Sequence, residues 1–514
     1  MLRNPRPCTV NAAFRRILES FSFPSVARNY AAFSSEAEVP FPQKLTSGGS
    51  YPSEYDLVIV GGGLVGSFLA CCLGTFPETK SLRVAVLESR RMASGNRVLP
   101  AIPDARVSAI SPSTVRLFKE IGIWDSVKKA RATPFTAMQV WEAGSGGYVR
   151  YDCDSAGLEQ LGFIVENSVV QQALQERLHT LSSTDLISPA SMASISLPPY
   201  PGAMTLEPAS NSAHSNQANL PSSEPNRPLS DWASIVLNDG RMLKARLVVG
   251  ADGSHSKVRG AVGMHTLTWD YDQKAVIATV QCAEHHQTAW QRFLPTGPLA
   301  VLPLHDTYSN IVWSTNSRHA EELLNLSDDE FVASLRTALT TNSFPPAPVF
   351  RPSLPFSFPF SSSATTSSSS SLPSMDFESP PVIEGVAGRR QAFPLAAAHA
   401  SAYVRPRLAL VGDAAHTVHP LAGQGVNMGY GDAHALTQAL QACVQAGADI
   451  GSETVLLQYE RKRMLENVAM VGSLHLLKSI FAVQWTPFAA ARSLGLTAVN
   501  SFSFIKNRIV SFAS

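Results

Sequence analysis

Apolar runs of strand length begin at residue 55 and alternate with a segment of helical character. Residues 55–60 predict a buried strand, residues 64–73 a helix rich in small and apolar side chains, and residues 82–87 a second strand that ends at Glu88. Strand, helix and strand of these lengths predict a βαβ unit within a parallel sheet.

Similar patterns return later in the chain. Residues 235–237 and 243–249 predict two strands joined by a turn at 238–240, and residues 408–411 predict a strand that is followed by a helix from about Gly425. The centre of the chain has the pattern of antiparallel strands. We therefore expect an α/β nucleotide-binding domain assembled from separated segments, with a β-rich lobe inserted into it.

Composition limits what this protein can be. The chain has 514 residues, 45% of them hydrophobic, which is enough for one large core or two smaller ones. Its formal net charge of +1 provides no basic field for a nucleic acid, so no nucleic-acid partner is expected. The six cysteines contain no Cys-x-x-Cys pair, which predicts neither a disulfide framework nor a zinc site.

Three segments are predicted to lie outside the folded core. Residues 1–30 contain five arginines and one acid, and they predict a mitochondrial transit peptide; a disordered basic tail is the alternative. Residues 195–230 and 357–382 are rich in polar, proline or serine residues, and we expect mobile surface insertions there without catalytic residues. No apolar run reaches the ~18 to 20 residues of a membrane-spanning helix.

A glycine motif follows the first predicted strand. Gly61, Gly63 and Gly66 have the Gly-x-Gly-x-x-Gly spacing between a strand and a helix. Gly61 allows the tight turn, Gly63 lets a pyrophosphate approach the backbone, and Gly66 lets the helix pack closely. Glu88 ends the next strand, where an acid can hydrogen-bond ribose hydroxyls. This motif alone leaves NAD and FAD open.

Two further motifs, one Asp-Gly and one Gly-Asp, resemble fingerprints of flavin monooxygenases. Asp252-Gly253 follows the strand at 243–249, and Gly412-Asp413 follows the strand at 408–411. The glycine-rich start of the next helix adds candidate cofactor-binding residues, namely Gly423, Gly425 and Asn427. Amides at a helix N-terminus stabilise negative charge such as that of a reduced flavin. Taken singly, each aspartate could be an ordinary helix cap.

Together these motifs resemble the UbiH-type branch of the FAD-dependent aromatic hydroxylases. The resemblance runs from about residue 55 to the C-terminus, and residues 104–110, 393–395 and 494–497 support it further. It implies FAD as cofactor, with Asp413 on the ribitol hydroxyls. It also implies an α/β fold, in which an FAD-binding Rossmann-like domain of the glutathione-reductase type carries an inserted β-rich substrate domain and a C-terminal helical region.

Composition, the predicted elements and the resemblance together give the expected division of the chain: transit peptide 1–30, linker 31–50, FAD-binding domain 51–130, 160–268 and 400–445, substrate domain 131–159 and 269–399, and C-terminal helical region 446–514. The resemblance also places Arg106 beside the flavin and the substrate, as a catalytic and cofactor-binding residue, and Gln171 near the FAD. A surface arginine and a solvated helical glutamine are the alternatives.

Two features have competing interpretations. His416 and His419 lie three residues apart, but a third ligand is not apparent, so we expect them to shape a pocket or form local hydrogen bonds, and we expect no metal. Beyond Glu466 the chain has basic and apolar residues but no acid, which fits either contact with an anionic membrane or a helical cap on the core.

The resemblance implies a monooxygenase that hydroxylates a polyprenylated hydroxybenzoate-type ring at carbon C5 in ubiquinone biosynthesis, through a flavin C4a-hydroperoxide. Dioxygen, a ferredoxin system or NAD(P)H, and a biosynthetic complex are the expected partners, on the matrix side of the inner mitochondrial membrane. An FAD monooxygenase acting on another hydrophobic substrate, or a non-catalytic prenyl-binding protein of the same fold, are the alternatives.

Overall fold

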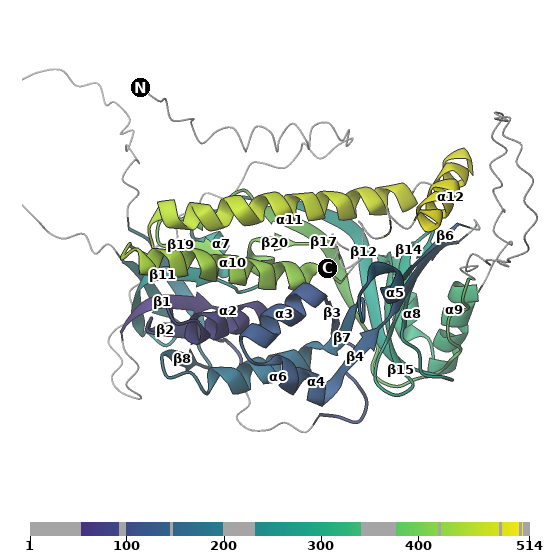
Figure 1. The fold of residues 1–514 in the computed structure, drawn as a ribbon, viewed down its shortest axis with the longest axis horizontal. Coiled ribbons are helices and arrows are strands. Elements are labelled where there is room, and N and C mark those ends of the chain that lie inside the picture. The colour runs from purple at the N-terminus through teal and green to yellow at the C-terminus, as the bar shows by residue number, and fades with distance from the viewer. Residues whose placement is uncertain are drawn as a thin grey trace, which may run out of the picture.

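The computed structural model describes residues 53–91, 99–143, 147–198, 232–340, 377–419, 423–482, 486–502 and 506. The predicted transit peptide and most of both predicted insertions lie outside the described residues. Two main sheets and a small connecting sheet organise the rest (Figure 1).

The first sheet is built around a parallel centre. β1 (Glu54–Val60) pairs in parallel with β2 (Val84–Leu87) on one side and with β11 (Met242–Gly250) on the other. β8 (Thr184–Ile187) and β19 (Leu408–Leu410) extend it in parallel. Antiparallel edge strands complete the sheet: β9 (Met192–Ser196), β10 (Ala233–Leu237) and β18 (Val404–Arg405). The last four residues of β1 are buried, because helices cover the sheet.

Several helices share the hydrophobic core of this sheet. They are α2 (Leu64–Thr75), α3 (Pro112–Glu120), α4 (Trp124–Arg131), α6 (Asn167–Leu178), α7 (Lys257–Ala261), α10 (Gly425–Gln445) and α11 (Glu453–Ala482). α2 contacts α10 and α6, and its buried small residues Gly66, Ala70 and Cys71 permit that close approach. The predicted βαβ unit, the strand pair β10–β11 and the helix beginning at Gly425 are therefore confirmed.

The longest strand of the second sheet is β12 (Thr266–Cys282). Neighbouring strands in this sheet run antiparallel, with one exception. Its other strands are β5 (Ala137–Glu142), β6 (Tyr148–Asp152), β13 (Thr288–Leu294), β14 (Gly297–Pro303), β15 (Tyr308–Asn316), β16 (Ile383–Val386), β17 (Gln391–Ala400) and β20 (His416–Thr417). β5 and β13 form the parallel pair. Helices α8 (Ser317–Asn325) and α9 (Asp328–Thr340) contact this sheet, which has a hydrophobic core of its own.

Short elements connect the two main sheets. β7 (Gly162–Glu166) pairs with β3 (Val107–Ile110) and β4 (Ala132–Phe135) in the small sheet. The remaining short elements are α5 (Cys153–Ala156) and the 3-10 turn η1 (Gly412–Ala414). The fold is thus α/β, with the expected antiparallel lobe inserted.

The C-terminal helices pack on the second sheet. α11 runs along the molecule and is followed by α12 (Thr486–Ser501) near β6 (Figure 1). The Phe481 ring stacks on Phe293 with 3.8 Å between centroids, and Arg492 Nε lies 2.5 Å from Glu142 Oε2, with both of these charged side chains buried. These contacts give the helical cap direct support. No described helix is both long and apolar enough to cross a membrane.

The edges of both predicted insertions were wrong. β9 continues to Ser196 because its backbone pairs with β10, so the first insertion starts later than residue 195. Phe377 packs edge-on against Trp141 at 5.8 Å, and Glu378 forms an ion pair with Arg150 at 2.5 Å, so the second insertion ends before residue 382. Composition marked these segments as polar but did not reveal partners that lie far away in the sequence.

Candidate cofactor-binding site

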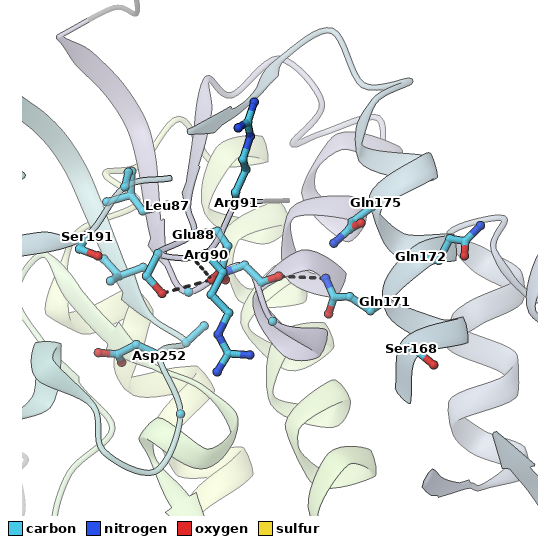
Figure 2. A pocket seen from close by; sticks show the side chains of 18 of the residues that line it. Leu87, Glu88, Arg90, Arg91, Ser168, Gln171, Gln172, Gln175, Ser191 and Asp252 are labelled. Atoms are coloured by element: carbon cyan, nitrogen blue, oxygen red, sulfur yellow. Dashed lines mark hydrogen bonds between the residues drawn. The ribbon is translucent and has the colours of Figure 1, made fainter. Parts of the chain in front are cut away.

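A cavity of about 1070 Å³ opens where β1, β2 and β11 end. Its wall is formed by the glycine loop, the segment after β2, one side of α6 and the loop between β11 and α7 (Figure 2). Parallel strands place their carboxyl ends at one edge of the sheet, where α/β proteins bind nucleotides.

The three predicted glycines meet different constraints. Gly61 has φ +112°, and a Cβ added there would lie 2.3 Å from the Ala251 carbonyl oxygen. A Cβ on Gly66 would lie 1.9 Å from the Gly61 oxygen, so Gly66 permits the packing of the helix on the loop. A Cβ on Gly63 would meet no protein atom within 4 Å, although Gly63 lines the cavity. The space beside Gly63 suits a ligand phosphate at the start of α2.

Two predicted side chains hold the glycine loop from neighbouring elements (Figure 2). Glu88 accepts hydrogen bonds from the Gly62 N–H at 3.0 Å and the Arg90 N–H at 2.9 Å. Gln171 Nε2 donates to the Gly62 carbonyl at 2.9 Å. Both side chains line the cavity, so the structure brings the acid and the helical glutamine together around one loop.

The loop after β11 contributes Asp252 and Gly253 to the same cavity. Asp252 Oδ2 accepts hydrogen bonds from the N–H groups of Lys257, at 2.7 Å, and Val258, at 3.1 Å, and so caps α7. Its buried Oδ1 has no hydrogen-bond partner among the described residues. Buried oxygens are rarely left unbonded, so this atom suits a ligand hydroxyl or an ordered water.

Arg259 joins the two aspartate-glycine motifs. Its Nη2 donates to the Ser254 carbonyl at 2.8 Å, and its Nη1 donates to the Ala414 carbonyl at 2.7 Å. Burial lowers the pKa of Arg259, and the charge of Asp252 opposes that shift. The two loops are therefore fixed relative to each other by one guanidinium.

The Gly412-Asp413 turn lies beside the first turn of α2 rather than on the cavity wall. Gly412 has φ +59°, and a Cβ there would lie 3.2 Å from the Val65 side chain. Asp413 is exposed although Gly412 and Ala414 are buried. An exposed carboxylate in an otherwise buried turn is available to a ligand that extends from the cavity past α2.

A buried network that no sequence motif indicated holds this turn. Asp432 on α10 is fully buried; its Oδ2 accepts hydrogen bonds from the Gly412 N–H at 3.0 Å and from His416 Nε2 at 2.5 Å. Its Oδ1 accepts hydrogen bonds from Arg463 Nε at 2.8 Å and Asn467 Nδ2 at 3.0 Å, both on α11. Burial alone would raise the pKa of Asp432, but His416 and Arg463 lower it to about 2.

The start of α10 is held against the end of β3. Gly423 has φ +60°, and a Cβ there would lie 3.0 Å from the Ala109 side chain. Asn427 Nδ2 donates to the Ala109 carbonyl at 2.7 Å, and Asn427 Oδ1 accepts from the Thr114 hydroxyl at 2.8 Å. Gly425 is the first residue of α10. These contacts fix the helix start, and direct contact of Asn427 with a cofactor stays a prediction.

Arg106 immediately precedes β3, and its side chain is exposed and lies outside the wall of the cavity. Its backbone is held firmly: its N–H donates to Asp104 Oδ1 at 3.0 Å, and its carbonyl accepts from the Asn167 N–H at 2.9 Å. The neighbouring Ala105 carbonyl accepts a hydrogen bond from Asn310 Nδ2 at 2.8 Å. The fixed backbone holds the exposed guanidinium in a position where it is accessible to a ligand.

Further charged residues line the cavity without having been predicted. Arg90 and Arg91 closely follow Glu88, and His255 and Lys257 follow Gly253. Their positions just after predicted binding residues are the feature of the sequence that could have identified them. Together with the glycine loop and the unbonded Asp252 oxygen, these groups fit the charged and hydroxyl-bearing parts of a flavin dinucleotide.

The two histidines of the predicted turn differ. His416 bonds to Asp432, which confirms the expected local hydrogen bond, whereas neither ring nitrogen of buried His419 has a hydrogen-bond partner among the described residues. Within the described part of the chain, no group of three His, Cys, Asp or Glu side chains could hold a metal ion.

Comparisons with known proteins agree with this geometry. A family model described as an FAD binding domain matches residues 379–472. The ubiquinone biosynthesis monooxygenase COQ6, mitochondrial, of Xenopus tropicalis is 38% identical over 476 residues, covering 90% of this chain and 94% of that protein. The Homo sapiens protein of the same name is 37% identical, covering 91% of this chain and 94% of its own length.

Solved structures show the same fold at lower identity. The p-nitrophenol 4-monooxygenase PnpA of Pseudomonas putida aligns with a TM-score of 0.61 and 18% identity, covering 89% of this chain and 97% of its own. PqsL of Pseudomonas aeruginosa, a probable FAD-dependent monooxygenase, aligns with a TM-score of 0.59 and 18% identity, covering 87% and 100%. With relatives this similar over nearly its whole length, the chain belongs to the family of ubiquinone biosynthesis monooxygenases named COQ6 and is an FAD-dependent aromatic monooxygenase.

Proposed function

We propose that this enzyme hydroxylates carbon C5 of the aromatic ring of a polyprenylated hydroxybenzoate-type intermediate in ubiquinone biosynthesis. The observation that carries the proposal is the 38% identity to a ubiquinone biosynthesis monooxygenase over 90% of the chain. The choice of C5 rests on the family resemblance of its motifs.

The residues of the site fit distinct parts of FAD. The glycine loop would receive the pyrophosphate at the start of α2, Glu88 the adenosine ribose, and Asp413 the ribitol. Bound and reduced, FAD supplies the activation of dioxygen. The chain itself would orient the ring beside Arg106 and exclude water, which explains why no obvious pair of acid and base side chains was found in the sequence.

The electron source in this proposal is a ferredoxin system or NAD(P)H. The sequence contains no second Gly-x-Gly-x-x-Gly motif for a separate nicotinamide domain, so either donor would act transiently. Membership of a biosynthetic complex is likewise expected from the family.

We place the enzyme in mitochondria, peripherally on the matrix face of the inner membrane. The relatives named above carry a mitochondrial designation. Three large apolar side chains of α11 are exposed, Leu465, Leu476 and Leu477. Leu465 and Leu476 are eleven residues apart, which returns a helix to the same face. Such a face would let the enzyme reach the ring of a lipid-tailed substrate.

The test combines genetics with chemistry. Deleting the gene should cause accumulation of a prenylated ring that lacks the C5 hydroxyl. Purified FAD-loaded enzyme, first reduced chemically and then mixed with dioxygen, should convert that compound in a single turnover. Mass spectrometry and NMR of the product locate the new hydroxyl. A hydroxyl at another ring carbon would contradict the regiochemistry, and no turnover of any prenylated hydroxybenzoate would contradict the substrate class.

A further inference from the structure

A cluster of aromatic and titratable side chains lies at the junction of the two main sheets. Tyr271 is in a bulge of β12, where the pairing with β17 shifts between Asp270 and Gln273. His419 follows β20, on the segment that links Asp413 to α10. Lys478 comes from α11, which passes over both sheets (Figure 1). Three distant parts of the sequence thus meet between the flavin-binding segment and the antiparallel lobe.

The contacts within this cluster are aromatic. Lys478 Nζ lies 3.5 Å from the centre of the Tyr271 ring. The rings of Tyr271 and His419 meet edge to face, with 5.1 Å between centroids, and the His475 ring stacks on Tyr271 at 6.2 Å and 27°. A phenol ring holds an ammonium group in place but does not neutralise it.

Lys478 lacks a counter-charge within the described chain. Arg492, the next basic residue along the sequence, pairs with Glu142, whereas no ion pair of Lys478 with a described acid occurs. Burial lowers the pKa of Lys478 to about 8, so the side chain is mostly protonated at neutral pH. A half-buried cation without a carboxylate favours binding of an anion.

His419 points to a ligand independently. Its side chain is 2% exposed, and neither ring nitrogen bonds to a described residue. Burial, together with the charge of Lys478, lowers its pKa to about 4, so the ring is neutral and retains one N–H donor. Buried polar atoms are seldom left without partners in folded proteins.

We propose that Lys478 and His419, held in place by Tyr271, bind the carboxylate of a benzoate-type aromatic substrate. A carboxylate is charged at neutral pH and supplies the missing counter-charge, whereas a phenol hydroxyl is neutral there. The inference rests on the proposed function and deepens it, because it names the side chains that would select a ring bearing a carboxylate.

The test measures the binding of two matched probes to purified FAD-loaded enzyme through the change in flavin absorbance. One probe is a geranylated para-hydroxybenzoate, and the other carries a hydroxymethyl group in place of the carboxylate. Wild type should bind the acid more tightly than the alcohol. Lys478→Met should weaken acid binding about ten- to hundredfold, the usual effect of losing a charge-assisted hydrogen bond, and leave alcohol binding within about twofold.

Further variants keep the test decisive. Lys478→Arg should recover most of the acid affinity, and His419→Asn should weaken acid binding with FAD retained. Lys462→Met is the matched control, since Lys462 is an exposed lysine of the same helix that contacts Gln438. If Lys478→Met loses FAD, His419→Asn decides instead, and unchanged acid affinity in that variant would overturn the carboxylate site.

The outcomes separate the two proposals. Equal affinity of wild type for acid and alcohol, or equal weakening of both probes in Lys478→Met, would overturn the carboxylate site. If the wild type hydroxylates only the alcohol, the carboxylate site is wrong while ring hydroxylation stands. If the wild type neither binds nor converts either probe, the proposed function fails together with this inference.

Discussion

His416 Nε2 and Asp432 Oδ2 lie 2.5 Å apart, and both side chains are almost completely buried. The same carboxylate oxygen accepts the Gly412 N–H, so this pair sets the backbone immediately before Asp413. Residues without any predicted contact to the cofactor therefore hold the turn that is proposed to bind its ribitol.

Asp432→Asn should lower the free energy of unfolding by about 3 to 5 kcal/mol, because it removes the only fully buried carboxylate that pairs with the Arg463 guanidinium among the described residues. Urea denaturation measures the change. Glu466→Gln is the control, since Glu466 also pairs with Arg463 but is 54% exposed, and its loss should cost less than about 1 kcal/mol. Equal effects of the two substitutions would contradict a special role for Asp432.

Asp432 should also make stability sensitive to acid. Its pKa in the folded protein is about 2, below the ordinary 3.8, so its stabilising contribution is complete above the ordinary value and is lost as the pH falls toward 2. Unfolding free energies of wild type and Asp432→Asn measured against pH should therefore converge at the acidic end. A constant difference down to pH 2 would show that another group controls this dependence.

Gly61→Ala should impair folding, whereas Gly63→Ala should impair FAD binding. The Cβ that Gly61→Ala introduces would clash with the Ala251 carbonyl at 2.3 Å in a strained backbone, so this variant should yield little folded protein. The Cβ at position 63 meets no protein atom, so Gly63→Ala should fold but bind FAD poorly. Circular dichroism and FAD content separate the two defects, and full FAD content in Gly63→Ala would place the pyrophosphate elsewhere.

Asp413→Ala should give folded protein whose FAD affinity is about ten- to hundredfold lower, since a hydrogen bond to a charged group contributes about 1.5 to 3 kcal/mol. Folding should be unaffected because the side chain is exposed. FAD content after purification and the melting temperature of the apoprotein provide the measurements. Stoichiometric FAD in the variant would remove Asp413 from the site.

Arg106→Ala should keep most of the FAD yet lower hydroxylation, because the exposed guanidinium lies outside the cavity wall while its backbone is fixed by Asp104 and Asn167. Single-turnover product formation is the measurement. Arg116→Ala, at an exposed position of α3, serves as control. Unchanged product formation in Arg106→Ala would mean that the resemblance does not extend to this residue.

Leu465→Glu combined with Leu476→Glu should weaken binding to cardiolipin-containing liposomes without loss of FAD, because both side chains are exposed on one face of α11. Arg492→Glu should instead destabilise the fold, since it places a second carboxylate beside buried Glu142. Sedimentation with liposomes and thermal unfolding distinguish the two effects. Unaltered liposome binding by the double variant would assign membrane contact to another surface or to a partner.

Much of this protein can be predicted from local sequence. The strands at the start of the fold, the helix between them and the turn before β11 are each encoded by neighbouring residues, since apolar periodicity and glycine act over a few positions. The spacing of Gly61, Gly63, Gly66 and Glu88 likewise defines a nucleotide-binding unit, because all four lie within one βαβ segment.

Tertiary structure decided what depends on distant partners. Arg259 reaches Ala414, and Asp432 joins Gly412 to α11, across separations that no local pattern records. The basic C-terminal residues, whose composition fitted a membrane surface equally well, include Arg492 paired inward with Glu142. The physical reason is that residue type and spacing specify the local backbone, whereas the partner of a buried charge is set only when the sheets and helices pack together.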